Sequence, residues 1–444
     1  MRIVLAVHHF PPQHRGGAEL RACRTALALK QRGHHVRVVT VARIDDGLPG
    51  QISSTEDTYE QIEVHRLSFN LLGARDYSRL EYDNHWIGEY LRNRFARWRP
   101  DVFHLVGGYL ITARPLVVAG ELRVPTVVTL TDFWWLCSRI SMLRSNGHLS
   151  TLPIDPRRCA RCLGEERRRY RWPGRLAPGL MNMFWRLRRK QVRQVEERLD
   201  LLRRTLNQAQ VIISPSQFVR SVHIEAGIAP ERIVYCRQGR DLPDVGSETM
   251  AKSVSDRLRV GYLGQIAQVK GVHVLLEAAG RLPRLPLTIK VYGDVTAFPA
   301  YAHRLSRLAA RDTRVEFLGV YVESELRQVL RGLDVVVVPS QWYENSPNVI
   351  LEALACRTPV IASNLGGMAE LIQHGRNGLL FEAGNASDLA AQLGRLVEEP
   401  GLLDALRRGT GPVRSMDEEI SELVGIYERA VGSRVASGAS SLHR

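Results

Sequence analysis

Residues Pro339–Leu354 read PSQWYENSPNVILEAL, and this segment indicates the architecture of the whole chain. Just before it, residues 333–338 read LDVVVV, a short apolar run of the kind that forms a parallel strand buried on both faces. Ser346 is a favoured N-cap and Pro is tolerated at the first helical position, so we predict that a helix begins at Pro347. A strand, a loop and a helix N-terminus in this order are typical of a phosphate-binding site in an open α/β sheet.

Two carboxylates flank this predicted helix start, Glu344 in the loop and Glu352 in the second turn. Eight residues of helix rise about 12 Å. The acid and base of a glycoside hydrolase lie only about 5 to 10 Å apart. We therefore expect the two carboxylates to hold different parts of one long ligand. The alternative is that both are solvated charges that complement the helix dipole.

The E-x7-E spacing beside a helix start resembles the acidic motif of the family 4 retaining glycosyltransferases, which have the GT-B fold of two facing Rossmann-like α/β domains with a cleft between them. The resemblance implies that Glu344 contacts hydroxyls of the donor sugar and that Glu352 contacts the nucleotide ribose. It also implies that the donor diphosphate is bound by the backbone amides around the helix start, at Asn345, Ser346 and Asn348.

A second loop, residues 264–271, reads GQIAQVKG and lies between the first predicted strand and helix of the second half. The family commonly has an Arg here before a Lys-Gly pair, and the two cations clamp the diphosphate. This chain keeps Lys270 but has Gln265 in the place of the Arg, so we expect the diphosphate to be held by helix-end amides and Lys270. A solvent-exposed lysine is the alternative. The segment with Gly366, Gly367 and Glu370 matches a further loop of the family.

In the first half, Gly16 and Gly17 follow a predicted strand over residues 1–7 but do not form a G-x-G-x-x-G dinucleotide fingerprint. The resemblance implies that Gly17 lets the backbone approach the donor phosphate or the acceptor. The family often has a His where this chain has Thr131, and Thr cannot carry a proton near neutral pH. Either another group makes the sugar contact that the family's His would make, or the activity is weakened. The implied catalytic residues are Glu344, Lys270 and Thr131.

Strands and helices alternate in both halves, which predicts the α/β class with parallel sheets. The predicted organisation is an acceptor-side Rossmann-like domain over 1–238 with a basic insert at about 139–204, a linker over 239–257, a nucleotide-sugar-binding domain over 258–414, a helix over 415–431 that packs back on the first domain, and a flexible tail over 432–444.

The chain carries a net charge of +15, and residues 157–204 hold sixteen Arg or Lys against five Asp or Glu. We predict that this segment binds an anionic membrane surface, since each cation near an anionic leaflet contributes about 1 kcal/mol. A solvated face is the alternative, and a specific nucleic acid is not expected because no reading motif accompanies the charge. Residues Met183–Arg204 have helical spacing. The apolar side chains expected to insert are Met183, Phe184, Trp185, Leu187 and Leu199.

Six cysteines at irregular spacing do not form a secreted disulfide framework. No stretch approaches 18 uninterrupted apolar residues, so we predict a cytoplasmic protein that is soluble or peripheral at the inner face of the membrane. Three of the cysteines, Cys137, Cys159 and Cys162, are candidate zinc ligands, with His148 as a fourth ligand. The alternative is plain thiols.

The resemblance implies a retaining transfer of sugar from a nucleotide diphosphate sugar to a saccharide or lipid-linked acceptor, in polysaccharide or glycolipid assembly. No cofactor or metal is expected, and the leaving phosphate takes the acceptor proton. Two alternatives stay open. One is a catalytically impaired protein of the same fold that binds an anionic polymer or nucleic acid, and the other is a sugar-nucleotide hydrolase or epimerase.

Overall fold

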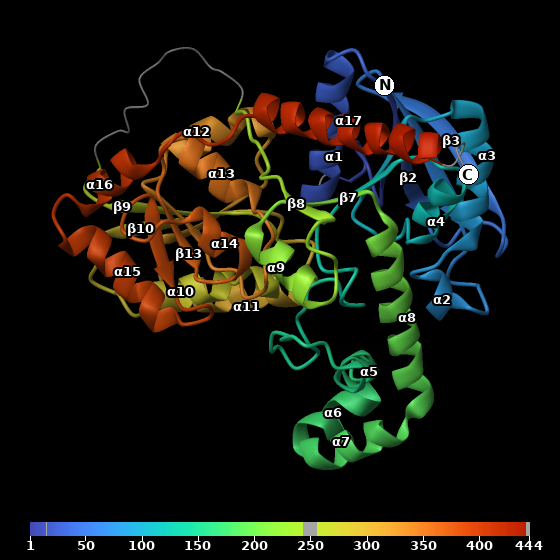
Figure 1. Ribbon diagram of the computed structural model, residues 1–444. Helices are drawn as coiled ribbons and strands as arrows, with labels where there is room; N and C mark the ends of the chain where they lie inside the picture. Colours follow the sequence, from blue (N-terminus) through green and yellow to red (C-terminus); the bar gives the residue numbers. More distant parts are fainter. Residues whose placement is uncertain (15, 243–254, 441–444) are drawn as a thin grey trace. The chain divides into compact units, whose positions relative to one another are not determined.

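The computed structural model describes residues 1–14, 16–242 and 255–440, so the predicted linker lies largely outside the described residues (Figure 1). The chain divides into two compact units. The N-terminal unit comprises Met1–Arg237 together with the chain from Asp417 onward, and the C-terminal unit comprises Gln238–Met416. No helix in the described ranges combines the length and the apolar character that crossing a bilayer requires.

The N-terminal unit is built on a sheet of eight described strands in the order β3-β4-β2-β1-β5-β6-β7-β8. All pair in parallel except β3, which is antiparallel to β4. Glu60 and Gln61 both have positive φ, as the two central residues of a type I′ hairpin require. The strands are β1 (Arg2–Val7), β2 (His35–Arg43), β3 (Ile52–Tyr59), β4 (Ile62–Phe69), β5 (Val102–Val106), β6 (Thr126–Thr129), β7 (Val211–Ser214) and β8 (Ile233–Tyr235).

Helices connect these strands, and the last helix of the chain, α17 (Met416–Ser440), also belongs to this unit. Arg21 donates to Glu419 at 2.7 Å, and the buried ring of His104 bonds the hydroxyl of Tyr427 at 2.7 Å. The helix continues to Ser440 and so includes residues 432–440, which were predicted as a flexible tail. The other helices of this unit outside the insert are α1 (Gly17–Gln31), α2 (Tyr77–Leu80), α3 (His85–Trp98), α4 (Arg114–Glu121) and α9 (Gln217–Glu225).

The basic insert forms a helical subdomain, and Figure 1 shows α5, α6 and α7 gathered at one end of the long α8. The single helix predicted over Met183–Arg204 is wrong, because the chain leaves helical geometry at Arg188, where ψ is 57°. A Cβ on Gly164 would meet the Trp185 ring at 2.0 Å, so α7 and α5 pack in close contact. The helices are α5 (Pro156–Gly164), α6 (Arg168–Leu176), α7 (Pro178–Leu187) and α8 (Arg189–Gln208).

This packing corrects which apolar side chains of the insert face solvent. Trp185 is only 5% exposed, and Leu199 packs against the small core of Ala160, Val192 and Val195. Neither is available for insertion into a membrane. The exposed apolar side chains of α6 and α7 are Trp172, Leu176, Leu180, Met183 and Leu187, each more than half exposed.

The C-terminal unit has a sheet of six described parallel strands in the order β11-β10-β9-β12-β13-β14. The strand order reverses between β9 and β12, and ligands of open α/β sheets bind at the carboxyl ends of such a pair. The strands are β9 (Leu258–Leu263), β10 (Leu287–Tyr292), β11 (Val315–Gly319), β12 (Val335–Val338), β13 (Val360–Ser363) and β14 (Gly378–Phe381).

The predicted double burial of the LDVVVV run is confirmed. Val335 and Val337 pack in one hydrophobic cluster, and Val336 and Val338 pack in another. The alternation follows from the two-residue period of a strand. The helices on the two faces are α10 (Val272–Gly280), α11 (Pro299–Ala309), α12 (Leu326–Arg331), α13 (Asn348–Ala355), α14 (Gly366–Leu371), α15 (Ala386–Glu398) and α16 (Leu402–Gly409), with short 3-10 turns η1 (Gln268–Lys270) and η2 (Glu323–Glu325).

Candidate functional site

The loop after β12 holds Glu344 as a buried carboxylate, 9% exposed. Its Oε1 accepts hydrogen bonds from Lys270 Nζ at 2.6 Å, Trp342 Nε1 at 2.7 Å and Ser340 Oγ at 2.8 Å. In the described structure these three hydrogen bonds to the Glu344 carboxylate all end on Oε1. Glu344 Oε2 can therefore accept a hydrogen bond from a ligand hydroxyl, while the hydrogen bonds to Oε1 fix the conformation of the loop.

Lys270 reaches Glu344 because the loops after β9 and β12 are in direct backbone contact. Gly271 has φ of 76°, and a Cβ there would lie 1.9 Å from the Pro339 carbonyl oxygen. The amide of Gln341 also donates to the carbonyl of Val269 at 2.8 Å. The Lys270 ammonium lies 5.0 Å from the centroid of the Trp342 ring, and its side chain is 24% exposed. The structure thus presents a fixed, partly accessible cation at the switch point of the sheet.

A third loop, after β13, supports the backbone of Glu344. The amide of Gly367 donates to the Glu344 carbonyl at 2.9 Å, and a Cβ on Gly367 would lie 1.7 Å from the Asn345 carbonyl oxygen. Gly366 has φ of 57° and is also packed against this loop. Close packing against the backbone of the Glu344 loop therefore requires glycine at both Gly366 and Gly367. Glu370, about one turn along α14 from Gly366, is exposed.

Glu352 lies in a separate buried ion cluster. Arg240 donates from Nε to Glu352 Oε1 at 2.9 Å and from Nη2 to Glu323 Oε1 at 2.9 Å. Arg240 is 4% exposed and Glu352 is 6% exposed. Sequence reasoning missed Arg240, which stood in the segment predicted as a linker. A lone arginine in such a segment gives no signal until a buried carboxylate is found beside it.

The start of α13 differs from the prediction by one residue. Pro347 has extended ψ of 122° and caps the helix without a side-chain hydrogen bond, so the helix begins at Asn348 and the assignment of Ser346 as the N-cap is wrong. Ser346 Oγ is buried and has no hydrogen-bond partner in the described structure. The side-chain carbonyl of Asn348 accepts from Gln238 Nε2 at 2.6 Å. An orphaned buried hydroxyl at a helix start is available to a ligand oxygen.

Gln265, which stands in the place of the family's arginine, has an exposed side chain. Its backbone carbonyl accepts from the hydroxyl of Tyr262 at 2.7 Å, which fixes the loop. Burial, together with the negative charge of Glu344, raises the pKa of Tyr262, so this hydroxyl stays protonated and acts as a donor. Gln265 contributes no cation, and Lys270 is the charged side chain that this loop brings to Glu344.

Thr131 and Gly17 belong to the N-terminal unit. Thr131 donates to Asp132 at 3.2 Å, and a Cβ on Gly107 would lie 2.7 Å from its hydroxyl. Burial raises the pKa of Asp132, against the opposing hydrogen bond from the Trp134 amide. A Cβ on Gly17 would meet nothing within 4 Å, whereas one on Gly16 would lie 2.5 Å from the Glu19 carboxylate.

The sequence interpretation did not single out His8, which follows β1 directly. Its Nε2 lies 3.3 Å from Glu19 Oε1, and its Nδ1 is buried without a partner in the described structure. Burial alone raises the pKa of Glu19, but the hydrogen bond and charge of His8 outweigh it and lower that pKa. The sequence feature that could have identified His8 is its position at the end of a buried strand, ahead of a Gly-Gly-x-Glu turn.

The zinc hypothesis is wrong on this structure. Cys137, Cys159 and Cys162 line one apolar cavity of about 30 Å³, but His148 is exposed and does not line it. Among the described residues, no three side chains of metal-ligating type are placed to hold an ion. Burial and the neighbouring thiols raise the pKa of Cys159 to about 12. In the absence of a metal, these apolar surroundings favour the neutral thiol.

Both halves of the chain resemble known glycosyltransferases in sequence. The family model described as Glycosyltransferase Family 4 matches residues 15–242, and the model described as Glycosyl transferases group 1 matches residues 257–399. The D-inositol 3-phosphate glycosyltransferase of Rhodococcus jostii is 33% identical over 224 residues, which are 46% of this chain and 49% of that protein. The chain thus spans about half the length of this curated relative.

The solved structures that resemble the whole chain include the following two. Alr3699/HepE of Anabaena, in complex with UDP, aligns with a TM-score of 0.63 at 18% identity and full coverage of both chains. Sucrose-phosphate synthase from Thermosynechococcus elongatus aligns with a TM-score of 0.65 at 18% identity, covering 97% of this chain and 99% of its own. With the two sheets described above, these likenesses confirm the predicted fold class of two Rossmann-like α/β domains.

Proposed function

The chain belongs to Glycosyltransferase Family 4, and on that premise we propose that it moves a sugar from a nucleotide diphosphate sugar to an acceptor hydroxyl with retention of configuration. The observation that carries this proposal is the Lys270–Glu344 pair at the switch point of the C-terminal sheet. Such a pair suits a ligand that has both an anionic group and hydroxyls. The UDP complex of the Anabaena protein makes uridine diphosphate sugars the first donors to test.

Each side chain has a role in this proposal. Lys270 binds the donor diphosphate, Glu344 accepts from hydroxyls of the sugar, and Glu352 accepts from the ribose. Arg240 orients the Glu352 carboxylate through the hydrogen bond at 2.9 Å. Ser346 Oγ and the amides at the start of α13 bind further phosphate oxygens, because a helix N-terminus favours negative charge.

In the transfer step, the bond between the anomeric carbon and the diphosphate oxygen breaks, and the acceptor oxygen bonds to that carbon on the same face. The departing phosphate oxygen takes the proton of the acceptor hydroxyl. Lys270 stabilises the negative charge that develops on the diphosphate, in a site that is already organised before the reaction. The proposal includes no divalent metal, because Lys270 and the α13 terminus supply the positive potential.

The proposal is tested by screening nucleotide diphosphate sugars in a thermal-shift assay and then measuring turnover with and without saccharide acceptors. A donor at about 100 times its dissociation constant stabilises the protein by about 2.7 kcal/mol. Lys270→Ala abolishes most of this shift, and Glu344→Gln chiefly lowers turnover. Lys290→Ala on β10 and Glu316→Gln on β11 are the matched controls. Full activity in both site variants contradicts the proposal, and turnover that ignores the acceptor favours a hydrolase or epimerase.

We also propose that the insert places the protein on an anionic membrane, where a lipid-linked acceptor would be found. The exposed apolar side chains of α6 and α7 support this, since Leu176 is 80% exposed and Leu187 is 77% exposed. They are flanked by exposed cations on α7 and α8, such as Arg186, Arg189 and Lys190. Apolar insertion beside basic side chains is the pattern of interfacial helices.

Co-sedimentation with liposomes tests the membrane proposal. Recovery in the pellet should rise with anionic lipid and fall with salt. It should drop when Arg186, Arg189 and Lys190 are changed to Gln, or when Leu176 and Leu187 are changed to Ser. A control with the same change of charge replaces the exposed residues Arg284, Arg307 and Arg311 by Gln. Equal recovery with neutral and anionic liposomes at low salt contradicts the proposal.

A further inference from the structure

A groove of about 620 Å³ crosses the N-terminal unit between the carboxyl edge of its sheet and the helical insert. One wall contains Ile44, Leu71, Tyr109 and Trp134, which follow β2, β4, β5 and β6 respectively. The other wall comes from α5, α6, α7 and α8 of the helical insert. Both the volume and the position at strand carboxyl ends are typical of a small-molecule site. None of the donor-binding assignments above uses this groove.

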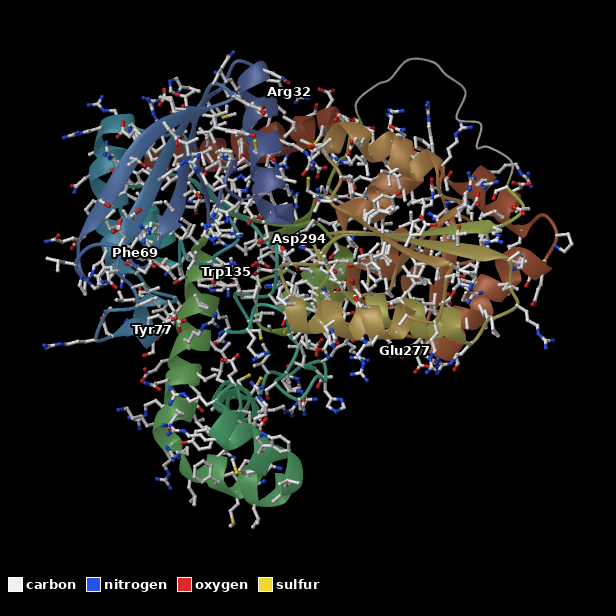
Figure 2. The ribbon with its side chains drawn as sticks, turned by 180° about the vertical axis from the view of Figure 1, so that it is seen from behind. Arg32, Phe69, Tyr77, Trp135, Glu277 and Asp294 are labelled. Carbon is white, nitrogen blue, oxygen red and sulfur yellow. The ribbon has the colours of Figure 1, made fainter. Side chains whose placement is uncertain are left out.

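Aromatic rings are concentrated in the groove. Tyr77 lies at one wall beside α8, as Figure 2 shows, and Trp185 contributes from α7. The C–H face of a sugar ring packs well on such apolar rings, whose polar ends remain free to hydrogen bond. Tyr109 also lies beside the His8 ring, with 5.7 Å between the ring centroids. This contact places one end of the groove next to the His8–Glu19 pair. The aromatic lining residues are Tyr77, Tyr82, Tyr109, Trp134, Tyr170 and Trp185.

Arg198 on α8 lies in the wall of this groove and is 7% exposed. Its Nη2 donates to the Trp134 carbonyl at 2.6 Å, and its guanidinium lies 5.3 Å from the centroid of the Trp134 ring. Its Nη1 is buried without a hydrogen-bond partner, and no carboxylate in the described structure forms an ion pair with it. Although burial lowers the pKa of Arg198 to about 10, the side chain remains charged at neutral pH.

A buried cation that forms no direct ion pair is costly to the folded state. The negative charge of Glu81, which lines the same groove, offsets only part of the effect of burial on the pKa of Arg198, so a ligand anion that pairs directly with the guanidinium explains why this cation is retained. The charges of the other lining residues also favour an anionic ligand, because arginines outnumber carboxylates among them. The arginines are Arg167, Arg169 and Arg188, and the carboxylates are Glu81 and Glu166. The indole Nε1 of Trp185 is a second buried donor that lacks an acceptor in the described structure.

We propose that this groove binds the glycosyl acceptor and that the acceptor carries an oxyanion, a phosphate or a carboxylate, which Arg198 binds beside a sugar ring. The inference rests on the proposed transferase function and adds the chemical class of the acceptor. Aromatic walls bind the sugar, and the guanidinium forms charge-assisted hydrogen bonds to the oxyanion.

The test is a titration followed by tryptophan fluorescence, since Trp134 and Trp185 line the groove. The full chain carrying Lys270→Ala is used, so that phosphate binding at the proposed donor site does not contribute. The probes are glucose 6-phosphate, glucuronate and glucose. We expect one of the two anionic sugars to bind about tenfold or more tightly than glucose, because only the anionic sugars accept a charge-assisted hydrogen bond from Arg198 at their oxyanion. The tighter of the two identifies phosphate or carboxylate as the oxyanion.

Arg198→Gln and Arg188→Gln should each remove most of the preference for the anionic sugar. Arg193→Gln is the matched control, since Arg193 is exposed on the same helix and does not line the groove. If Arg198→Gln fails to fold, Arg188→Gln and Arg169→Gln decide the question. Equal affinity for glucose and both anionic sugars overturns the inference. It is also overturned if Arg193→Gln loses as much of the preference for the anionic sugar as Arg198→Gln does. The donor thermal shift reports on Lys270 separately, so failure of the donor site and failure of the groove are distinguishable.

Discussion

At the scale of single residues, the carboxylate of Glu344 shows how the candidate donor site is organised. Three donors from two loops converge on one oxygen, and one of them is the cation assigned to the diphosphate. Lys270 therefore has a partner before the donor arrives. A ligand phosphate competes with Glu344 for the ammonium, or shares it, without the lysine having to change its position. Such preorganisation lowers the cost of binding.

Gly367 tests the backbone contact behind this loop. We expect Gly367→Ala to destabilise the C-terminal unit by about 1–3 kcal/mol, the usual cost of overpacking, because the new Cβ would lie 1.7 Å from a carbonyl oxygen. Donor binding should weaken with it, since the carbonyl belongs to Asn345. Chemical denaturation and the donor thermal shift measure the two effects. Gly280→Ala is the control, because a Cβ there meets nothing within 4 Å. Equal stability of the two variants contradicts the prediction.

Arg240 and Glu352 should respond unequally to substitution. Arg240→Met takes a buried cation away from both Glu352 and Glu323, and breaking a buried pair in this way costs about 3–5 kcal/mol. Glu352→Gln should cost less, because Arg240 keeps its 2.9 Å contact with Glu323, which is half exposed. Denaturant unfolding of the two variants and of Arg284→Met, a surface control, measures the difference. A larger loss in Glu352→Gln than in Arg240→Met contradicts this order.

At the scale of elements, the buried strands were the most predictable part of the chain. The strand predicted over residues 1–7 agrees with β1 to within one residue, and the apolar run predicted over residues 333–338 contains β12. The edge strand β3 was missed because its sequence, ISSTEDTY, is polar and mostly exposed. It therefore lacks the alternation of apolar and polar residues that predicts a strand. The break between α7 and α8 was missed for a different reason. Helical spacing continues through Arg188, and only the packing of Trp185 on α5 shows that the chain turns there.

The junction of α17 with the N-terminal sheet should make stability depend on pH. Burial lowers the pKa of His104 to about 3 from an ordinary 6.5, so below pH 6.5 the unfolded chain binds a proton that the folded one does not. Stability is therefore fully present above about pH 6.5 and is lost as the pH falls toward 3. Between pH 6.5 and 4.5 this histidine alone should remove about 2 kcal/mol.

Urea unfolding at pH 7.5 and 4.5 measures this loss. His104→Asn should be less stable than the parent at pH 7.5, because it removes the contacts with Tyr427 and Thr129. Its stability should also change less between the two pH values. His148→Asn, at an exposed histidine of the same unit, should retain the parent's dependence. An unchanged dependence in His104→Asn would show that this histidine is not the group that titrates.

At the scale of the whole molecule, the candidate site was predictable where loops at a strand end carry distinctive residues, as at Lys270 and Glu344. It was not predictable where function depends on burial. Arg240 and Arg198 are two arginines among many in the sequence, and only the fold shows that each is almost completely enclosed. The aromatic groove could not be derived either, since its walls come from segments far apart in the chain.

The proposed chemistry also predicts how the intact enzyme behaves without divalent ions. Donor turnover should be unchanged by an excess of chelator, since Lys270 and the amides of α13 stabilise the departing diphosphate. The measurement is product formation before and after chelation, with a magnesium-dependent transferase as the positive control. A complete loss of activity that magnesium or manganese restores would contradict the proposed metal-independent step.

The contribution of α17 to the N-terminal unit has a consequence for biosynthesis. His104 and its partner Tyr427 are 323 positions apart, and the whole C-terminal unit is encoded between the two parts of the N-terminal unit. At about 5–20 residues per second, the ribosome needs roughly 10–40 s to proceed from Arg237 to Tyr427. During that interval the C-terminal unit can already be complete while the nascent N-terminal unit still lacks its last helix. The part of the protein that is translated first can thus be the last to finish folding.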